Sequence, residues 1–354
     1  MTASSARPQV AVFGTGSWGT AFSSVLAEAG CTVRMWGKFA DEVDDINRTR
    51  TSARYLPHLL LPESISATTD PGEALEGAAI GVLAVPAQSV RANFADWGHL
   101  VPSDIVLVSL MKGLEKGTSL RMSEVVQQSC DIPADQIAVV SGPNIAREIA
   151  AKEPAATTVA SSSLATAHFV ADACHTSYFR PYVHDDVVGA ELGGCVKNVI
   201  ALASGMTEGL GLGHSVTAAV ITRGLSEMRA LGEAMGAHPA TFAGLAGVGD
   251  LVVTCLSPHS RNSTFGRNLG RGLTVDEVVA LTKQTAEGVA SCGAMRDLAA
   301  HHGVAMPIVD NVTAVVHEGR TAGEFAEVIL AMLTTNSSCC LLYTSDAADE
   351  RSSV

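Results

Sequence analysis

The sequence predicts an α/β domain with a doubly wound, mainly parallel sheet, followed by an all-α domain. Three observations support this prediction. Short apolar runs alternate with helical segments in the first half, helical segments alone fill the second half, and 354 residues are enough for two domains. Hydrophobic residues make up 47% of the chain and charged residues 17%, so a sizeable core can form.

The predicted strands of the first domain are apolar runs of four to six residues, a pattern typical of strands buried on both faces of a sheet. These runs are residues 9–13, 32–36, 80–85, 105–110 and 137–140. Segments with helical spacing lie between them, at 18–29, 41–50, 90–97 and 120–129, and a further strand and helix are predicted at 157–160 and 164–174. Such repetition implies right-handed crossovers in one open sheet.

After residue 188 the strand-like runs stop. Residues 190–206, 216–235, 275–282, 288–301 and 325–333 are predicted helices, separated by glycine and proline. We therefore place the α/β domain at 1–188 and an all-helical domain at 189–336. Residues 337–354 continue no periodic pattern, and we expect them to be a disordered, aberrant tail left by a frameshift, a vector or an assembly error.

Charge and composition exclude several classes of protein. With 36 Asp and Glu against 23 Lys and Arg, the net charge of −13 argues against a nucleic-acid partner or a membrane-surface protein. We expect no membrane insertion, because no continuous apolar run reaches the ~18 residues of a spanning helix. The N-terminus has no apolar signal segment, and the eight cysteines form no CxxC motif, so a cytoplasmic location is expected. The eleven histidines show no metal-ligand spacing, and we predict no metal.

A glycine motif follows the first predicted strand. Gly14, Gly16 and Gly19 form GxGxxG between that strand and the first helix. Gly14 permits a tight turn, Gly16 lets the backbone approach a pyrophosphate, and Gly19 lets the helix pack close to the strand. This context favours a Rossmann dinucleotide-binding domain over a purely structural glycine turn.

The end of the second predicted strand bears on the choice of cofactor. An NAD-specific site usually carries Asp or Glu about 20 residues after the glycine motif, where it holds the ribose 2′-hydroxyl. Here the first acid is Asp41, and Lys38 precedes it. This favours NADP(H), although Lys38 could equally be a solvated loop lysine.

Two predicted strand ends carry polar groups, at the edge where open α/β sheets bind ligands. Lys112 follows the run at 105–110, and the segment 141–144, which contains Gly142 and Asn144, follows the run at 137–140 and opens a helix. Ordinary strand-end chemistry is the alternative for both.

The helical half contains two charges that would be costly to bury. Lys197 lies in a nearly apolar helix, where it either reaches the surface or is held in a cleft as a proton donor. Asp250 is a single acid in an apolar, glycine-rich stretch, and a lysine is its natural partner. Residues 260–262 (Ser-Arg-Asn) stand at a predicted helix start, which suits either phosphate binding or simple N-capping with a solvated arginine.

Together these motifs resemble the bacterial-type NAD(P)-dependent glycerol-3-phosphate dehydrogenases. The resemblance extends from about residue 10 to 333, and its segments occur in the family order. They are GTGSWGTA (14–21), YLP (55–57), AVP (84–86), MKGLE (111–115), SGPNIAREI (141–149), ELGGCVKNVIALASG (191–205), AAVITRGLSEM (218–228), TFAGLAGVGDLVVTC (241–255), SRN (260–262) and EGV (287–289).

The resemblance implies reversible reduction of dihydroxyacetone phosphate to sn-glycerol 3-phosphate, which feeds phospholipid synthesis, and a homodimeric assembly. By position, it makes Lys197 the general acid/base, supported by Asp250, with Lys112 as a further catalytic residue. The implied substrate-binding residues are Lys112, Gly142, Asn144, Lys197, Asp250, Ser260, Arg261 and Asn262. The implied cofactor contacts are Gly14, Gly16, Ser17, Trp18, Gly19, Lys38, Phe39, Tyr55, Lys112, Ala146, Arg261, Thr285 and Glu287.

The chain departs from the family pattern at three places. The family usually has Asp-Asn or a similar pair where this chain has His214-Ser215, so these two residues receive no role. Phe39 stands where a second basic residue is common, and the C-terminal end differs after residue 332. The alternatives are a sister β-hydroxyacid or phosphogluconate-type dehydrogenase and a non-catalytic NADP(H)-sensing protein.

Overall fold

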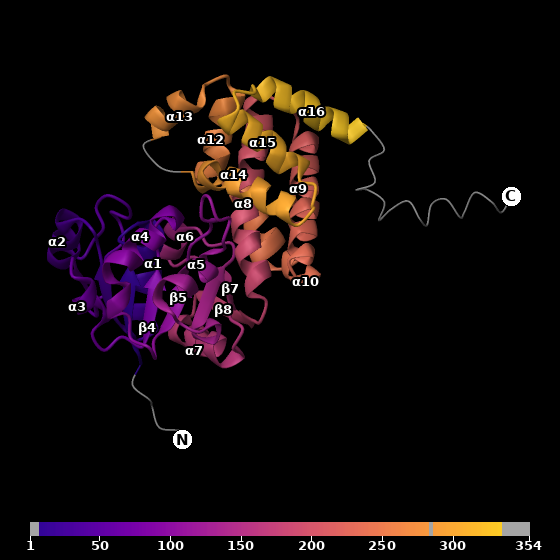
Figure 1. The fold of residues 1–354 in the computed structure, drawn as a ribbon. Coiled ribbons are helices and arrows are strands. Elements are labelled where there is room, and N and C mark those ends of the chain that lie inside the picture. Colours follow the sequence, from indigo (N-terminus) through magenta and orange to yellow (C-terminus); the bar gives the residue numbers. More distant parts are fainter. Residues whose placement is uncertain (1–6, 283–285, 335–354) are drawn as a thin grey trace. The chain divides into compact units, whose positions relative to one another are not determined.

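The computed structural model describes residues 7–282 and 286–334, with side chains as far as Met332. The described residues form two compact units (Figure 1). The first comprises the residues up to Cys195 together with Met235–Asp250, and the second comprises Val196–Ala234 and the residues from Leu251 onward. The tail predicted at 337–354 lies outside the described residues.

The first unit contains one eight-stranded sheet with the strand order β3-β2-β1-β4-β5-β6-β7-β8. Neighbouring strands are parallel except β6 and β7, which are antiparallel. The strands are β1 (Gln9–Phe13), β2 (Thr32–Trp36), β3 (Ile65–Thr68), β4 (Ile80–Leu83), β5 (Val106–Ser109), β6 (Ile137–Ser141), β7 (Ala155–Ala160) and β8 (Phe179–His184). The predicted doubly wound, mainly parallel sheet is confirmed.

Helices cover both faces of this sheet, as the alternation of buried side chains along β1 requires. Val10 and Val12 belong to one apolar cluster with residues of α1, α2, α6 and α7, whereas Ala11 and Phe13 belong to a second cluster with α3, α4 and α5. The helices are α1 (Ser17–Glu28), α2 (Ala40–Thr49), α3 (Pro71–Leu75), α4 (Val90–Trp97), α5 (Met122–Cys130), α6 (Ala146–Ala150) and α7 (Leu164–Cys174), with short 3₁₀ turns η1 (Ala87–Ser89), η2 (Gly98–Leu100) and η3 (Ala134–Gln136).

The remaining elements are helical, as predicted. They are α8 (Val187–Gly209), α9 (His214–Ala234), α10 (Pro239–Phe242), the π-helical turn η4 (Leu245–Gly249), α11 (Asp250–Leu256), α12 (Arg261–Gly270), α13 (Val275–Thr282), α14 (Glu287–His301), α15 (Pro307–His317) and α16 (Ala322–Thr334). In the second unit α15 packs against α9, α14 and α16. The sequence did not predict α10, η4, α11 or α15, although Pro307 occupies the first turn of α15, a favoured place for proline.

Glycines bring the backbones of α8 and α12 together in the second unit. A Cβ at Gly205 would overlap the carbonyl oxygen of Ser263, and a Cβ at Gly266 would overlap that of Leu202. Gly209 and Gly270 repeat the pattern one turn further along, where added Cβ atoms would overlap backbone atoms of the facing helix. The four-residue spacing on both helices places these glycines on the two facing surfaces, so the helices pack backbone to backbone.

Among the residues that the structure describes, two segments are long and apolar enough to span a membrane by length and composition, which corrects the expectation that none would be. They are Val187–Gly209, with mean hydropathy 1.3, and Pro239–Leu256, with mean hydropathy 1.5. The expectation rested on continuous apolar runs, whereas small and polar residues interrupt both segments and still leave the mean hydropathy at 1.3 and 1.5. The first segment is 89% buried inside the protein, as expected for a core helix.

Candidate active site

The glycine loop joins β1 to α1 with the geometry that its sequence predicts. Gly14 has a φ of +124°, and a Cβ there would lie 2.6 Å from the Ala84 carbonyl oxygen. A Cβ at Gly19 would overlap the Gly14 carbonyl oxygen, whereas a Cβ at Gly16 would meet nothing within 4 Å. Gly14 and Gly19 are therefore required by packing within the protein. Gly16 faces open space, where a ligand can approach the backbone.

The start of α1 fits the pyrophosphate of a dinucleotide. Its N-cap residue, Gly16, provides no side-chain cap, so the N–H groups of the first turn, including that of Ser17, have no capping acceptor. Such a helix start attracts phosphate through these donors and the helix dipole. The indole nitrogen of Trp18 is also buried without a hydrogen-bond partner among the described residues. Both features fit a bound nicotinamide dinucleotide.

The residues predicted to contact the adenosine end lie after β2 and α2. Lys38 is exposed, and Phe39 is the N-cap residue of α2 with 54% of its surface exposed. Tyr55 is half-buried against the apolar cluster that includes α1. The guanidinium of Arg54 lies 5.3 Å from the centre of the Tyr55 ring.

Lys112 forms a largely buried ion pair with Asp250. Its Nζ donates to Asp250 Oδ2 at 2.7 Å and to the Gly142 carbonyl oxygen at 3.0 Å. The Lys112 side chain is 17% exposed and that of Asp250 is 1% exposed. The structure therefore brings together three predicted site residues from the end of β5, the end of β6 and the start of α11. Support of Lys197 by Asp250 stays a prediction.

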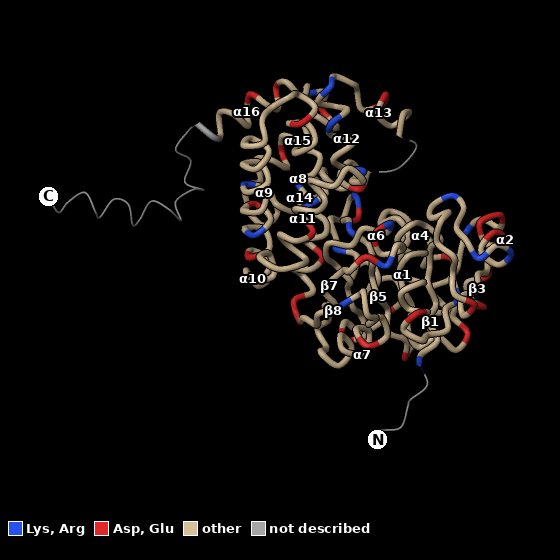
Figure 2. The backbone as a smooth tube through the Cα atoms, turned by 180° about the vertical axis from the view of Figure 1, so that it is seen from behind, with Lys and Arg blue, Asp and Glu red and all other residues tan. Residues whose placement is uncertain are grey.

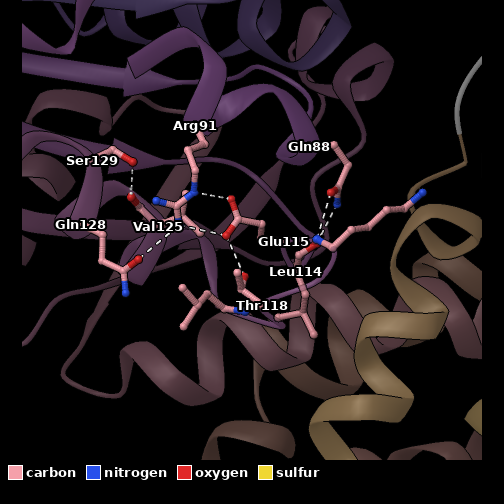
Figure 3. A network of polar contacts seen from close by, with 10 residues as sticks. Gln88, Arg91, Leu114, Glu115, Thr118, Val125, Gln128 and Ser129 are labelled. Atoms are coloured by element: carbon pink, nitrogen blue, oxygen red, sulfur yellow. Dashed lines mark hydrogen bonds and ion pairs between the residues drawn. The ribbon is translucent and has the colours of Figure 1, made fainter. Parts of the chain in front are cut away.

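The segment after Lys112 is fixed by a network of polar contacts (Figure 3). Arg91 on α4 donates from Nε to Glu115 Oε1 at 2.7 Å and from Nη2 to Glu115 Oε2 at 2.9 Å. Gln88 donates to the Leu114 carbonyl oxygen at 2.7 Å and accepts from the Lys116 N–H at 3.0 Å. These contacts hold residues 114–116 against η1 and α4 and thereby restrict the position of Lys112, which lies two residues before Leu114.

The β6 end is held by β7. Asn144 donates from Nδ2 to the Ala156 carbonyl oxygen at 3.2 Å, and its Oδ1 accepts from the Thr157 hydroxyl at 2.8 Å. A Cβ at Gly142 would lie 3.1 Å from the Thr157 Cα, so this position has little room for a side chain. Ala146 is the first residue of α6, and its backbone therefore belongs to a helix start.

In the second unit Lys197 lies on α8 and is only 6% exposed. Its Nζ donates to the Thr254 hydroxyl oxygen on α11 at 2.7 Å. Lys197 is therefore held inside the protein, which decides against the alternative of a side chain that reaches the surface. Sequence reasoning missed Thr254. Its spacing of four residues from Asp250, on one helix face, is the signal that could have found it.

The predicted phosphate segment begins α12. Ser260 caps this helix, with its hydroxyl accepting from the Ser263 N–H at 3.2 Å, and Arg261 is exposed. Asn262 donates to Asn198 Oδ1 at 2.9 Å and accepts from the Gly288 N–H at 2.9 Å. The amide of Asn262 thus connects α8 to the start of α14. Asn198, next to Lys197 in sequence, was not predicted as a site residue.

The start of α14 carries Glu287, another predicted cofactor contact. Burial raises the pKa of its carboxyl above the usual range, and the positive charge of Arg261 acts in the opposite direction. The other predicted residue of this segment, Thr285, lies outside the described residues. Among the described residues, no group of three or more His, Cys, Asp or Glu side chains is placed to hold a metal ion.

A glycine-loop site in a doubly wound sheet, followed in the chain by a helical unit with a buried lysine, defines the class of two-domain dehydrogenases that use a nicotinamide dinucleotide. The sequence model of the NAD-dependent glycerol-3-phosphate dehydrogenase N-terminus matches residues 9–167, and that of the C-terminus matches residues 186–327. The chain belongs to the NAD-dependent glycerol-3-phosphate dehydrogenase family.

Relatives and solved structures agree with this assignment. A protein of Streptomyces griseus named glycerol-3-phosphate dehydrogenase (NAD(P)+) is 58% identical over 313 residues, covering 88% of this chain and 93% of the relative. A protein of Mycobacterium tuberculosis named glycerol-3-phosphate dehydrogenase (NAD(P)+) 2 is 50% identical over 325 residues, covering 92% of this chain and 97% of the relative. The crystal structure of glycerol-3-phosphate dehydrogenase from Coxiella burnetii is 36% identical, with a TM-score of 0.88, and covers 94% of this chain and 100% of that one.

Proposed function

We propose that this chain catalyses the reversible NAD(P)H-dependent reduction of dihydroxyacetone phosphate to sn-glycerol 3-phosphate, which supplies glycerophospholipid synthesis. The observation that carries the proposal is the buried ammonium of Lys197, which donates a hydrogen bond to the Thr254 hydroxyl. Both residues lie in segments that resemble the family, 191–205 and 241–255. Removing a charged group from water is costly. We infer that Lys197 is buried because it donates a proton to the alkoxide that develops during the reaction.

Lys197 acts as the general acid. When bound, the nicotinamide supplies the hydride that reduces the C2 carbonyl carbon of the substrate. Lys197 Nζ gives its proton to the C2 oxygen as that oxygen gains negative charge, and it takes the proton back in the reverse direction. The Thr254 hydroxyl orients the ammonium through their 2.7 Å hydrogen bond.

Lys112 and Asp250 complete the polar groups around the reacting atoms. The Lys112 ammonium, fixed by Asp250 Oδ2 and the Gly142 carbonyl, contacts substrate and cofactor, and Asp250 supports Lys197. Asn144 orients the substrate from the β6 end. The phosphate is held by the α12 start, where Ser260, Arg261 and Asn262 combine a guanidinium with helix N–H groups.

The dinucleotide is held by the glycine loop and by the residues that follow β2. Gly14, Gly16 and Gly19 shape the loop, and the first turn of α1, with Ser17 and Trp18, meets the phosphates. The other contacts are Lys38, Phe39, Tyr55, Ala146, Thr285 and Glu287. The charge of Lys38 and the absence of an acid directly after β2 favour NADP(H) over NAD(H).

We further propose a cytoplasmic homodimer that binds no nucleic acid and does not insert into membranes, with a domain border at residue 188. The negative net charge and the burial of α8 support this description. The apolar helices of the second domain favour dimer formation.

The test is oxidation of NADPH with dihydroxyacetone phosphate, compared with unphosphorylated dihydroxyacetone. We expect fast turnover only with the phosphorylated ketone, because the start of α12 binds the substrate through its phosphate. Equal turnover of both ketones would contradict the role of residues 260–262. Binding of NADPH without turnover of either ketone would contradict the proposed reaction.

Replacement of Lys197 by alanine tests the assigned acid. General acid catalysis contributes about 10²–10⁴-fold, so Lys197→Ala should lower kcat by that order while NADPH still binds. Lys152→Ala is the matched control, since Lys152 is a 60% exposed lysine paired with Glu28. Near-wild-type turnover of Lys197→Ala would refute the assignment.

A further inference from the structure

A short chain of polar contacts connects the glycine loop to an arginine after α2. Thr15, between the first two glycines of the motif, donates its hydroxyl to Glu42 Oε2 at 2.6 Å. The other carboxylate oxygen of Glu42 accepts from Arg54 Nη1 at 3.1 Å. Thr15 is 6% exposed and the Glu42 side chain 12%, whereas 67% of the Arg54 side chain is exposed. The inner part of this chain of contacts is therefore fixed, and its outer end reaches solvent.

These contacts lie at the end of β2, beside the position that reads the adenosine ribose. Gly37 directly follows β2, and a Cβ there would lie only 2.7 Å from Thr15 Cγ2. Thr15 thus packs against the end of β2. In NAD-specific dehydrogenases the acid that binds the ribose hydroxyl lies at this end of the second strand. Glu42 lies in the first turn of α2, four residues after Lys38. Figure 2 shows both signs of charge around α2.

The Glu42 carboxylate is already engaged at both oxygens. One oxygen accepts from the Thr15 hydroxyl and the other from the Arg54 guanidinium, so the carboxylate serves to hold the arginine. A guanidinium has five N–H donors in a planar fork that matches phosphate geometry, and the bond to Glu42 uses one of them. The Tyr55 ring, 5.3 Å away, restricts the guanidinium from a second side.

We propose that Arg54 is a specificity-determining residue that binds the 2′-phosphate of NADP(H), together with Lys38, while Glu42 and Thr15 set its position. This inference rests on the proposed function for the dinucleotide, but it concerns the adenosine end alone. NADH has a 2′-hydroxyl in place of the phosphate and gains nothing from a second cation there. Arg54 therefore strengthens the binding of NADP(H) and leaves the affinity for NAD(H) nearly unchanged.

The test is the Arg54→Gln variant, with Arg50→Gln as its matched control. Arg50 lies four residues earlier and also pairs with a glutamate, Glu63, at 2.9 Å. Binding is measured by calorimetry with adenosine 2′,5′-bisphosphate and with adenosine 5′-monophosphate, which differ only in the 2′-phosphate. A hydrogen bond to a charged group contributes about 1.5–3 kcal/mol, so Arg54→Gln should weaken bisphosphate binding roughly tenfold or more.

The monophosphate affinity should change less than about twofold in either variant, since the 2′-phosphate alone is recognised. Arg54→Lys should restore part of the bisphosphate affinity, because the charge returns without the planar fork. Equal weakening for both nucleotides, or unchanged bisphosphate binding, would overturn the proposal. So would a wild-type protein that binds both nucleotides equally.

Steady-state kinetics give a second readout. Arg54→Gln should raise the KM for NADPH with unchanged kcat and leave the KM for NADH as it is. If Glu42 instead reads the ribose 2′-hydroxyl, Glu42→Gln would raise the KM for NADH more than that for NADPH, which would overturn the proposal. Calorimetry needs no turnover, so an Arg54-dependent bisphosphate affinity in a protein without reductase activity would reject the proposed function and keep this inference.

Discussion

Replacement of Glu227 by glutamine should remove a large part of the pH dependence of stability in the second unit. Glu227 on α9 is 3% exposed, and its two carboxylate oxygens accept from the Ile308 N–H, at 3.0 and 3.1 Å, at the start of α15. Burial raises the pKa of this carboxyl to about 8, although the N–H donors and the charge of Arg223 act to lower it, and the charge of Asp310 adds to the rise.

The sign of the effect follows from the proton count. In the unfolded chain the carboxyl has the ordinary pKa of 4.5, so between pH 4.5 and about 8 the folded protein holds a proton that the unfolded chain has released. Stability from this group is complete below the unfolded pKa and is lost as the pH rises toward the folded pKa. Each pKa unit corresponds to about 1.4 kcal/mol, so a rise from about pH 5.5 to about pH 7.5 should lower the free energy of unfolding by about 2.5 kcal/mol.

Urea unfolding of the wild type and of Glu227→Gln at both pH values measures this effect. Glutamine resembles the protonated carboxyl and does not titrate, and Arg223 and Asp310 are present in both proteins. The difference between the two free energies of unfolding should therefore change by about 2.5 kcal/mol across this interval, in favour of glutamine at the higher pH. A difference that stays constant within about 0.5 kcal/mol would refute the raised pKa of Glu227 and the reasoning from burial.

Two further substitutions test the packing and the ion pair. Gly266→Ala should destabilise the protein by about 1–3 kcal/mol or more in thermal unfolding, because the methyl group meets a backbone carbonyl. Gly293→Ala, in α14 with open space around it, should instead stabilise by up to about 1 kcal/mol, and equal effects would contradict the packing argument. Asp250→Asn should cost about 1.5–3 kcal/mol and lower kcat/KM, since it weakens the buried bond to Lys112. Glu318→Gln, at an exposed ion pair with Arg296, should cost much less, because solvent screens that pair. Equal losses for these last two variants would show that burial of the pair does not matter.

The sequence predicted those strands that are buried on both faces. The bounds predicted for β1 and β2 agree with the structure residue for residue. Both strands are short, mainly apolar segments, and four of the five residues of β1 are fully buried, as expected for a central strand. It missed β3 and β8, which lie at the two edges of the sheet. The sequence of β8, Phe-Arg-Pro-Tyr-Val-His, contains a proline and half-exposed polar residues, which an edge strand tolerates and a sequence pattern does not reveal.

Lys197 and Asp250 could be recognised in the sequence as charged residues in apolar surroundings, where burial is costly. The sequence did not show which residues contact them. Asp250 bonds to Lys112, 138 residues earlier in the chain, and no spacing rule connects the two. The order of the strands decides this contact, because β5 and β6 end side by side and bring Lys112 to the Gly142 carbonyl. Residue identity thus predicted the chemistry, whereas only the fold selects which of the six lysines pairs with the acid.

The close packing of α8 and α12 also sets the relative positions of two parts of the proposed site in the second unit. Glycines allow the two backbones to touch at Gly205 and Gly266, and the same contact places Asn262, at the start of α12, within 2.9 Å of Asn198 on α8. Asn198 is the neighbour of Lys197, so the proposed phosphate site and the proposed acid are set at a fixed separation by one rigid contact. A substrate that is bound by its phosphate and reacts at its C2 oxygen benefits from such a separation, because small misplacements of reacting groups are costly in rate. Gly266→Ala should therefore raise the KM for dihydroxyacetone phosphate even at temperatures where the variant remains folded, and an unchanged KM would mean that the two helices can adjust without moving the site.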